Sequence, residues 1–237
     1  MAKLDIRVGC CGFAAARARY FRTFRVVEVQ QSFYDPPQVK TAERWRQEAP
    51  EGFEFAVKAW QLITHPATSP TCRRLRRPLT ESDKARVGNF QVTGPVLKAW
   101  KATLAVVRAL DARVVLFQCP ASFKPTDANL GNMRKFFTTI ERGKLRLAWE
   151  PRGKWEADTV RSLCDELRLV HCVDPFVSPP VTAGTRYFRP HGIGGYRYRF
   201  TDDEMGRLRP MCPAGETCYV LFNNMTMFED ARRFLSP

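Results

Sequence analysis

The chain has 237 residues, and its 44% hydrophobic and 26% charged content excludes an intrinsically disordered protein. No apolar run approaches the length of a membrane span, and charges at Lys3, Asp5 and Arg7 interrupt any signal peptide, so we expect a cytoplasmic protein. The net charge is +14, with 28 arginines against 10 lysines, which favours anionic or phosphorylated partners. Genomic base composition or a thermophilic surface would also explain this arginine excess, so charge alone does not establish nucleic-acid binding.

Eight short apolar runs recur along the chain. They cover residues 6–10, 26–30, 53–58, 114–118, 145–150, 169–173, 186–190 and 219–223. Several of them, such as VVLFQ at 114–118, are apolar at nearly every position. This pattern indicates parallel strands that are buried on both faces.

Helix-like segments lie between these runs. The first begins at Pro36-Pro37 and ends before Pro50-Glu51-Gly52. A second has an apolar face at helical spacing, made of Val96, Trp100, Leu104, Val107 and Leu110. Further helices are predicted over residues 129–142, 156–168, 202–209 and 227–235, the third of these beginning at the N-cap sequence TDDE. The segments after the first and sixth runs are short.

This alternation predicts a single (β/α)8 barrel of the TIM type over residues 1–237. An open doubly wound sheet is the alternative, but it usually has fewer strands, and no GxGxxG turn follows the first run. Residues 66–94 are too long for a simple connection. Because they follow the third strand, we expect them to form an arginine-rich loop over the barrel mouth.

Polar side chains collect where the predicted strands end, which is the face that carries the active site in such barrels. Glu150 and Asp174 are candidate general acids or bases, and His191 and His65 are candidate proton shuttles. The candidate substrate-binding residues are Lys58, Arg152, Arg189, Gln118, Asn223, Trp155 and Tyr34. The cations among them would clamp a phosphate or carboxylate, the amides would fix a sugar or base edge, and the aromatic rings would stack.

A structural role is the alternative for these groups, since Glu150 with Arg152 or Arg189 would make buried ion pairs that close the barrel top. Glu28 lies within an apolar strand, so it either points into the barrel toward a cation such as Lys58 or faces solvent near an edge, and we expect a structural or supporting role for it. His171 is expected to be a core histidine whose hydrogen bonds are satisfied. Polar groups are costly to bury, so their number at one end of the barrel favours a functional site.

The segment Arg73-Arg74-Leu75-Arg76-Arg77 carries four cations in five positions. Nearby residues cannot neutralise all four, so a phosphate backbone or another acidic partner is expected there, with a solvated loop as the alternative. No HxH, HExxH or CxxC spacing supports a metal site. We therefore predict no metal ligands and no cofactor, although a divalent metal would be compatible with the histidines and carboxylates of the strand ends.

Eight motifs together resemble the YecE-like domain-of-unknown-function family, the one numbered seventy-two, and most closely an archaeal-type branch. They are GCCGF (9–13), VEVQQSFY (27–34), FAVKAWQLITHP (55–66), VLFQCPASF (115–123), AWEPRGKW (148–155), VDPF (173–176), YFRPHG (187–192) and YVLFNN (219–224). The resemblance spans nearly the whole chain and implies a TIM-type barrel. It implies no settled reaction. Gln30-Gln31 and Pro190 depart from the usual family pattern.

The leading functional prediction is an enzyme, a hydrolase or an isomerase or lyase, that acts on a phosphate-bearing ligand. That ligand would be a nucleotide, a phosphosugar or a nucleic-acid end, bound at the C-terminal face of the barrel. The first alternative is a non-catalytic nucleic-acid-binding protein that uses its basic surface, and the second is a divalent-metal phosphoesterase. Each of these predicts partners that carry phosphate and no membrane.

Overall fold

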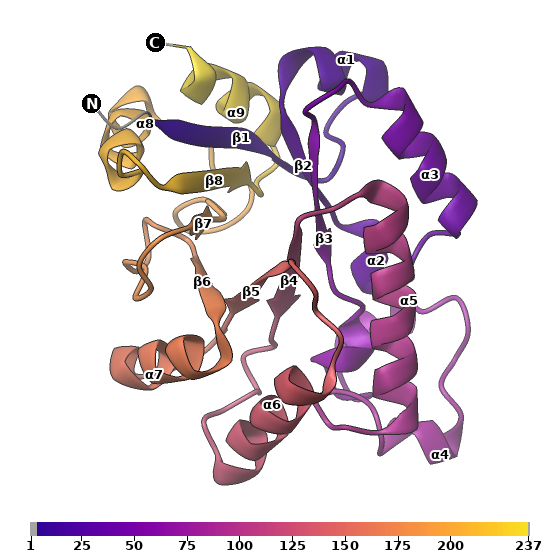
Figure 1. The fold of residues 1–237 in the computed structure, drawn as a ribbon. Coiled ribbons are helices and arrows are strands. Elements are labelled where there is room, and N and C mark those ends of the chain that lie inside the picture. The colour runs from indigo at the N-terminus through magenta and orange to yellow at the C-terminus, as the bar shows by residue number, and fades with distance from the viewer. Residues whose placement is uncertain (1–3, 237) are drawn as a thin grey trace.

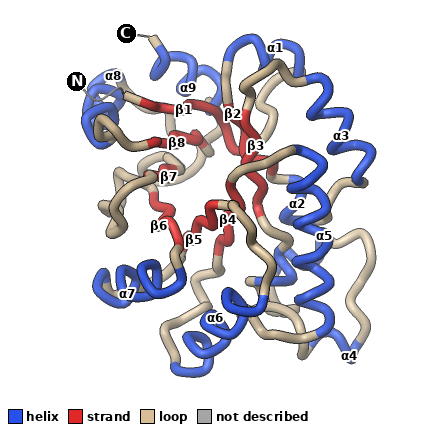
Figure 2. Tube along the Cα trace, in the orientation of Figure 1, coloured by secondary structure: helices blue, strands red, loops and turns tan. Residues whose placement is uncertain are grey.

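Eight parallel strands close into a barrel in the computed structural model, which describes residues 4–236 (Figures 1 and 2). Each strand forms at one of the predicted apolar runs, within a few residues of the predicted ends. The strands are β1 (Asp5–Cys11), β2 (Val26–Val29), β3 (Glu54–Lys58), β4 (Val114–Gln118), β5 (Arg146–Glu150), β6 (Leu169–Val173), β7 (Arg186–Phe188) and β8 (Thr217–Phe222). The TIM-type (β/α)8 prediction is confirmed.

Helices pack around this barrel. They are α1 (Arg17–Thr23), α2 (Gln31–Tyr34), α3 (Val39–Glu48), α4 (Glu81–Lys84), α5 (Gly94–Leu110), α6 (Asp127–Thr139), α7 (Ala157–Leu167), α8 (Asp202–Leu208) and α9 (Met227–Leu235). The range predicted for α9 matches, and the predicted cap of α8 is a complete capping box between Thr201 and Glu204. The prediction of 129–142 for α6 was shifted, because the Thr126 side chain caps the Asn129 N–H and the backbone is extended at Ile140.

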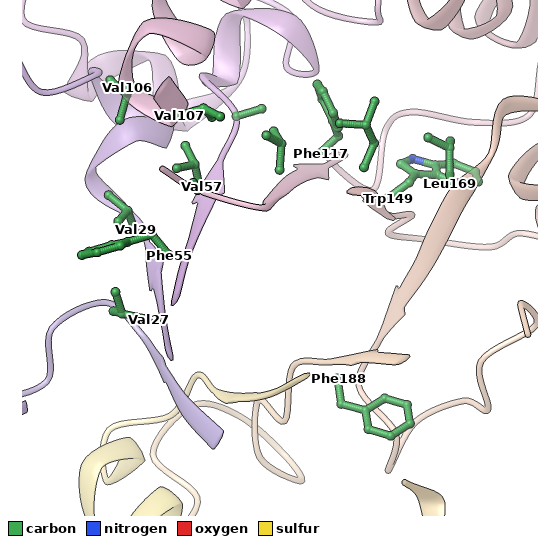
Figure 3. Packing of buried hydrophobic residues seen from close by; sticks show 14 of the residues in the cluster. Val27, Val29, Phe55, Val57, Val106, Val107, Phe117, Trp149, Leu169 and Phe188 are labelled. Carbon is green, nitrogen blue, oxygen red and sulfur yellow. The ribbon is translucent and has the colours of Figure 1, made fainter. Parts of the chain in front are cut away.

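Side chains of each strand alternate between the inside of the barrel and the surrounding helices. On β4, Val114 and Leu116 point inward, whereas Val115 and Phe117 join the outer layer. Figure 3 shows this outer layer, in which Val57 of β3 lies near Val107 of α5. Because both layers are apolar, the strands are buried on both faces, and this explains their nearly continuous hydrophobic sequence.

Two connections depart from a regular alternation of strand and helix. Among the described residues, no helix follows β6, and residues 174–185 run as a loop to β7 (Figure 2). The long segment 66–94 contains a 3₁₀ helix at Pro70–Arg74 as well as α4. Its end packs into the core, because Phe90 is completely buried and Gly88, at φ +83°, lies against the backbone of His65. These contacts hold the end of the segment against the residues that follow β3.

Candidate functional site

An ion-pair network fills the C-terminal end of the barrel. Arg189 follows β7, is completely buried, and binds two carboxylates through different nitrogens. Its Nη1 lies 2.5 Å from Glu150 Oε2, and its Nη2 lies 3.0 Å from Glu28 Oε1. Tyr187 Oη donates a hydrogen bond of 2.7 Å to the other oxygen of Glu28, and the Gln30 side chain also donates to this carboxylate. Glu28 thus points into the barrel, and its cation is Arg189 rather than Lys58.

Glu150 connects this buried network to the mouth of the barrel. Its Oε1 is 2.6 Å from Arg152 Nη2 and 3.2 Å from His191 Nε2. Burial alone would raise the pKa of Glu150, but Arg189, His191 and Arg152 together hold it well below its ordinary value. Glu150 is therefore ionised at neutral pH, and both of its oxygens are engaged.

His191 is the partly exposed member of the network, with 19% of its side chain accessible. Its Nδ1 lies 2.9 Å from Asn223 Nδ2. A neutral imidazole donates through one nitrogen and accepts through the other. With the proton on Nε2, the ring donates to Glu150 and Nδ1 accepts from the Asn223 amide; with the proton on Nδ1, Nε2 accepts from Arg152. Arg152 Nη2 lies 2.8 Å from His191 Nε2, and both nitrogens lie close to the same oxygen, Glu150 Oε1. Glu150 and Asn223 together fix the orientation of the ring.

Asp174 lies at the end of β6, but its carboxylate is occupied by backbone. Oδ2 accepts a hydrogen bond of 2.8 Å from the His191 N–H, and Oδ1 accepts one of 3.0 Å from the Phe176 N–H. These two contacts tie the loop after β6 to the loop after β7. Asp174 thereby positions His191 through the main chain, and its assignment as an acid or base stays a prediction.

Lys58, at the end of β3, is a cation beside this network that forms no ion pair with its carboxylates. It is 6% exposed, and its Nζ lies 3.9 Å from the centre of the Phe33 ring. Within residues 4–236 its ammonium has neither a hydrogen bond nor a salt bridge. Burial, followed by repulsion from Arg189, lowers the pKa of Lys58 to about 8. The Phe33 ring is the contact that the described residues offer this ammonium, so its N–H donors are available to a ligand.

The other predicted residues lie at several depths around the mouth. His65 is buried beside Phe33, with Nδ1 2.8 Å from Thr64 Oγ1. Gln118 pairs in register with Glu150, and its side chain makes no hydrogen bond with the described residues. The Trp155 indole stacks on Phe123, at 5.9 Å between ring centres.

The arginine-rich segment lies to one side, against α2. Arg74 stacks on the Tyr34 ring at 3.7 Å, and Arg76 Nε is 2.9 Å from Asp35 Oδ2. Arg73 and Arg77 are exposed and form no ion pair with the described residues. Two of the four arginines are thus engaged locally, and two are available to a ligand.

Sequence reasoning missed two members of the network, Tyr187 and Gln30. In sequence, Tyr187 is an ordinary aromatic residue of a strand. In the structure its side chain points into the barrel, where its hydroxyl donates to Glu28. Gln30 was noted only as a departure from the family pattern. Its position two residues after Glu28 is the signal that would have identified it, because alternate strand residues face the same side.

Two buried histidines predict a pH dependence of stability. Burial lowers the pKa of both His65 and His171 to about 4. Because the unfolded chain takes up these protons near pH 6.5, their contribution to stability is complete above that pH and is lost as pH falls from 6.5 toward 4. We expect urea midpoints to decrease over this window and His65→Gln to reduce the slope. Equal slopes for the variant and the wild-type protein would contradict this assignment.

Among residues 4–236, no three histidine, cysteine, aspartate or glutamate side chains are grouped so that they could hold a metal ion. No helix in this part of the chain is long and apolar enough to cross a membrane. The candidate site consists of charged and polar side chains at the ends of β2, β3, β5, β7 and β8.

The closed parallel barrel with polar strand ends defines a TIM-type barrel protein. The family model described as "Protein of unknown function DUF72" matches residues 13–235, and the chain belongs to this family. The prediction of an archaeal-type branch stays open. No curated protein matches the chain.

Solved structures share the fold at low sequence identity. A DUF72 family protein from Enterococcus faecalis V583 has a TM-score of 0.72 at 19% identity, covering 99% of this chain and 97% of that one. A DUF72 family protein from Thermotoga maritima MSB8 gives 0.72 at 19% identity, with 97% of each chain covered. A xylose isomerase domain containing protein from Salmonella typhimurium LT2 gives 0.58 at 12% identity, covering 99% of this chain and 97% of that one. These similarities establish the barrel fold.

Proposed function

We propose that this protein is an enzyme that binds a phosphate-bearing ligand at the C-terminal mouth of its barrel. The observation that carries the proposal is the nearly buried Lys58, whose ammonium contacts the Phe33 ring and forms no ion pair with the described residues. An unpaired cation inside a protein is costly, and a phosphate would satisfy it with charge-assisted hydrogen bonds. The overall charge of +14 adds long-range attraction for such a ligand.

The charges around Lys58 support this assignment. Glu28 and Glu150 are balanced by Arg189 and Arg152, and the Asp174 oxygens are bound by backbone N–H groups. Among these charged residues, Lys58 is the cation that no carboxylate neutralises. Arg152 is a second binding group, because its side chain is 38% exposed at the mouth of the barrel. Arg189 is too deeply buried to contact a ligand, and in this proposal it positions Glu150.

His191 carries the proton chemistry in this proposal. Glu150 holds the ring as an ionised acceptor of the Nε2 proton, in the way a carboxylate orients a catalytic imidazole. Proton transfer then occurs at Nδ1, once the reacting oxygen of the ligand takes the place of the Asn223 amide that contacts this nitrogen. This arrangement suits a hydrolase, or an isomerase or lyase, that acts on a phosphorylated compound.

Phosphate binding is tested by calorimetric titration with inorganic phosphate and phosphate monoesters. Lys58→Met is expected to weaken binding about 10- to 100-fold, because a charge-assisted contact contributes about 1.5–3 kcal/mol. Lys101→Met is the matched control, since Lys101 is exposed on α5, and it should bind like the wild-type protein. Equal affinities of the Lys58 variant and the control would contradict the proposal.

A non-catalytic nucleic-acid-binding protein is the second candidate function, and the unpaired Arg73 and Arg77 favour it. Arg77 also borders a 640 Å³ groove with Trp60 and Lys98. This function would be supported in place of the first by oligonucleotide binding that weakens steeply with salt. The binding should also require Arg73 and Arg77 and be unchanged by Lys58→Met.

A further inference from the structure

A pocket of 440 Å³ extends from the barrel mouth toward the outside of β6. It exists because residues 174–185 cover this side of the barrel, where a helix follows most other strands (Figure 1). At the mouth it is bordered by Arg152 and His191. Its size lies within the range of small-molecule sites, and its lining includes Arg152, one of the two cations that we assign to the phosphate, whereas Lys58 lies outside that lining.

The walls of this pocket beyond the mouth are mostly apolar. Trp155 and Val160 line one part, and Val181 with the largely exposed Val177, both of the loop after β6, line another. The Trp155 indole is fixed, because it stacks on Phe123 and its Nε1–H donates to the Phe123 carbonyl at 3.2 Å. A fixed aromatic wall and aliphatic side chains suit a flat, weakly polar group better than a sugar, whose hydroxyls would lose hydrogen bonds there.

His171 provides the polar feature of this wall. It is 6% exposed, and its Nδ1 accepts a hydrogen bond of 3.3 Å from the Val181 N–H. That contact places the ring hydrogen on Nε2, which has no partner among the described residues. His171 is thus a buried donor that lines a cavity with its hydrogen bond unused. His171 is buried with Nδ1 satisfied, in line with a core histidine, and its Nε2 faces the pocket.

We propose that this pocket binds the base of a nucleotide, with its ring between Trp155 and the valines and with His171 Nε2–H donating to a ring nitrogen or carbonyl. The inference rests on the proposed function, because it places the phosphate of the same ligand at Lys58 and Arg152. Nucleobases combine a flat face with hydrogen-bond acceptors at the edge, which are the two features that the pocket complements. An alkyl phosphate would leave the His171 donor unpaired, at a cost of about 1–3 kcal/mol.

Calorimetry on the full chain with the four nucleoside monophosphates AMP, GMP, CMP and UMP, ribose 5-phosphate and hexyl phosphate tests the base pocket. At least one nucleotide should bind tenfold or more tightly than ribose 5-phosphate and than hexyl phosphate. His171→Leu should remove most of that difference without changing the affinity for ribose 5-phosphate. Val160→Phe, which fills the pocket from α7 and keeps His171 in place, should have the same effect. Val39→Phe, an equal enlargement at an exposed position of α3, should not.

The outcomes separate the two proposals. If ribose 5-phosphate binds as tightly as every nucleotide and Lys58→Met weakens them all, the base pocket is overturned and the phosphate site stands. If hexyl phosphate binds most tightly, the pocket takes an aliphatic group and the base assignment is overturned. If nucleosides without phosphate bind in a His171-dependent way while Lys58→Met has no effect, the base pocket stands and the proposed function fails.

Discussion

Arg189→Met is expected to lower the free energy of unfolding by about 3–5 kcal/mol, because it removes one partner of a buried ion-pair network. Arg189 is completely buried and compensates two carboxylates, Glu28 and Glu150, that are themselves almost inaccessible. Without it, both acids stay in the barrel with the Tyr187 hydroxyl, the Gln30 amide, Arg152 and His191 as their remaining partners. Urea denaturation at pH 7 measures the effect.

The pH dependence of this loss identifies its cause. In the wild-type protein the pKa of Glu150 is held low, so its contribution to stability is present above the unfolded pKa and is lost as pH falls. In the variant, burial of Glu150 without Arg189 should raise its pKa above the unfolded value, so stability should fall as pH rises through 4 toward 7. Arg134→Met, which breaks only an exposed pair with Glu166, should cost about 0–1 kcal/mol. A similarly small effect of Arg189→Met would mean that the network contributes little to stability.

Phosphate affinity is expected to fall about tenfold or more between pH 7 and pH 9.5. The pKa of Lys58 is lowered to about 8, so its ammonium is mostly charged at pH 7 and mostly neutral at pH 9.5. A phosphate monoester is already close to doubly charged at pH 7, so the ligand contributes little to this change. Because the bound anion favours the protonated amine, affinity is highest below pH 8 and decreases as pH rises through that value. Calorimetric titration across this range measures the fall.

The variant Lys58→Met provides the comparison for this profile. It should bind weakly at every pH and show a nearly flat profile, because no group with a pKa near 8 remains at the site. A wild-type profile without any decrease above pH 8, or an identical decrease in the variant, would show that the lysine does not titrate in contact with the anion.

The positions of the strands and of the mouth could be predicted from sequence because both depend on local patterns. A strand buried on two faces must be apolar throughout, and the residues following parallel strands share one edge. Lys58, Glu150 and His191 were located in this way. Their partners could not be found so directly, since Glu28 and Arg189 are 161 positions apart and meet only when the barrel closes.

The roles of Asp174 and His171 depend on main-chain geometry that composition does not encode. Asp174 resembles a catalytic carboxylate in sequence, yet two backbone N–H groups occupy its oxygens. His171 resembles a core residue, yet a loop rather than a helix follows β6, and this loop leaves a pocket beside it. In both cases the conformation of residues 174–185 decides the outcome.

The most direct test of an anion site at the mouth is a crystal structure of the protein soaked with tungstate, a strongly scattering oxyanion of phosphate-like shape. The anion should lie within hydrogen-bond distance of Lys58 Nζ and beside Arg152, and it should be absent from crystals of Lys58→Met. Tungstate bound only at Arg73 and Arg77, or bound at the mouth equally well in the Lys58 variant, would contradict the assignment of the mouth as a Lys58-dependent phosphate site.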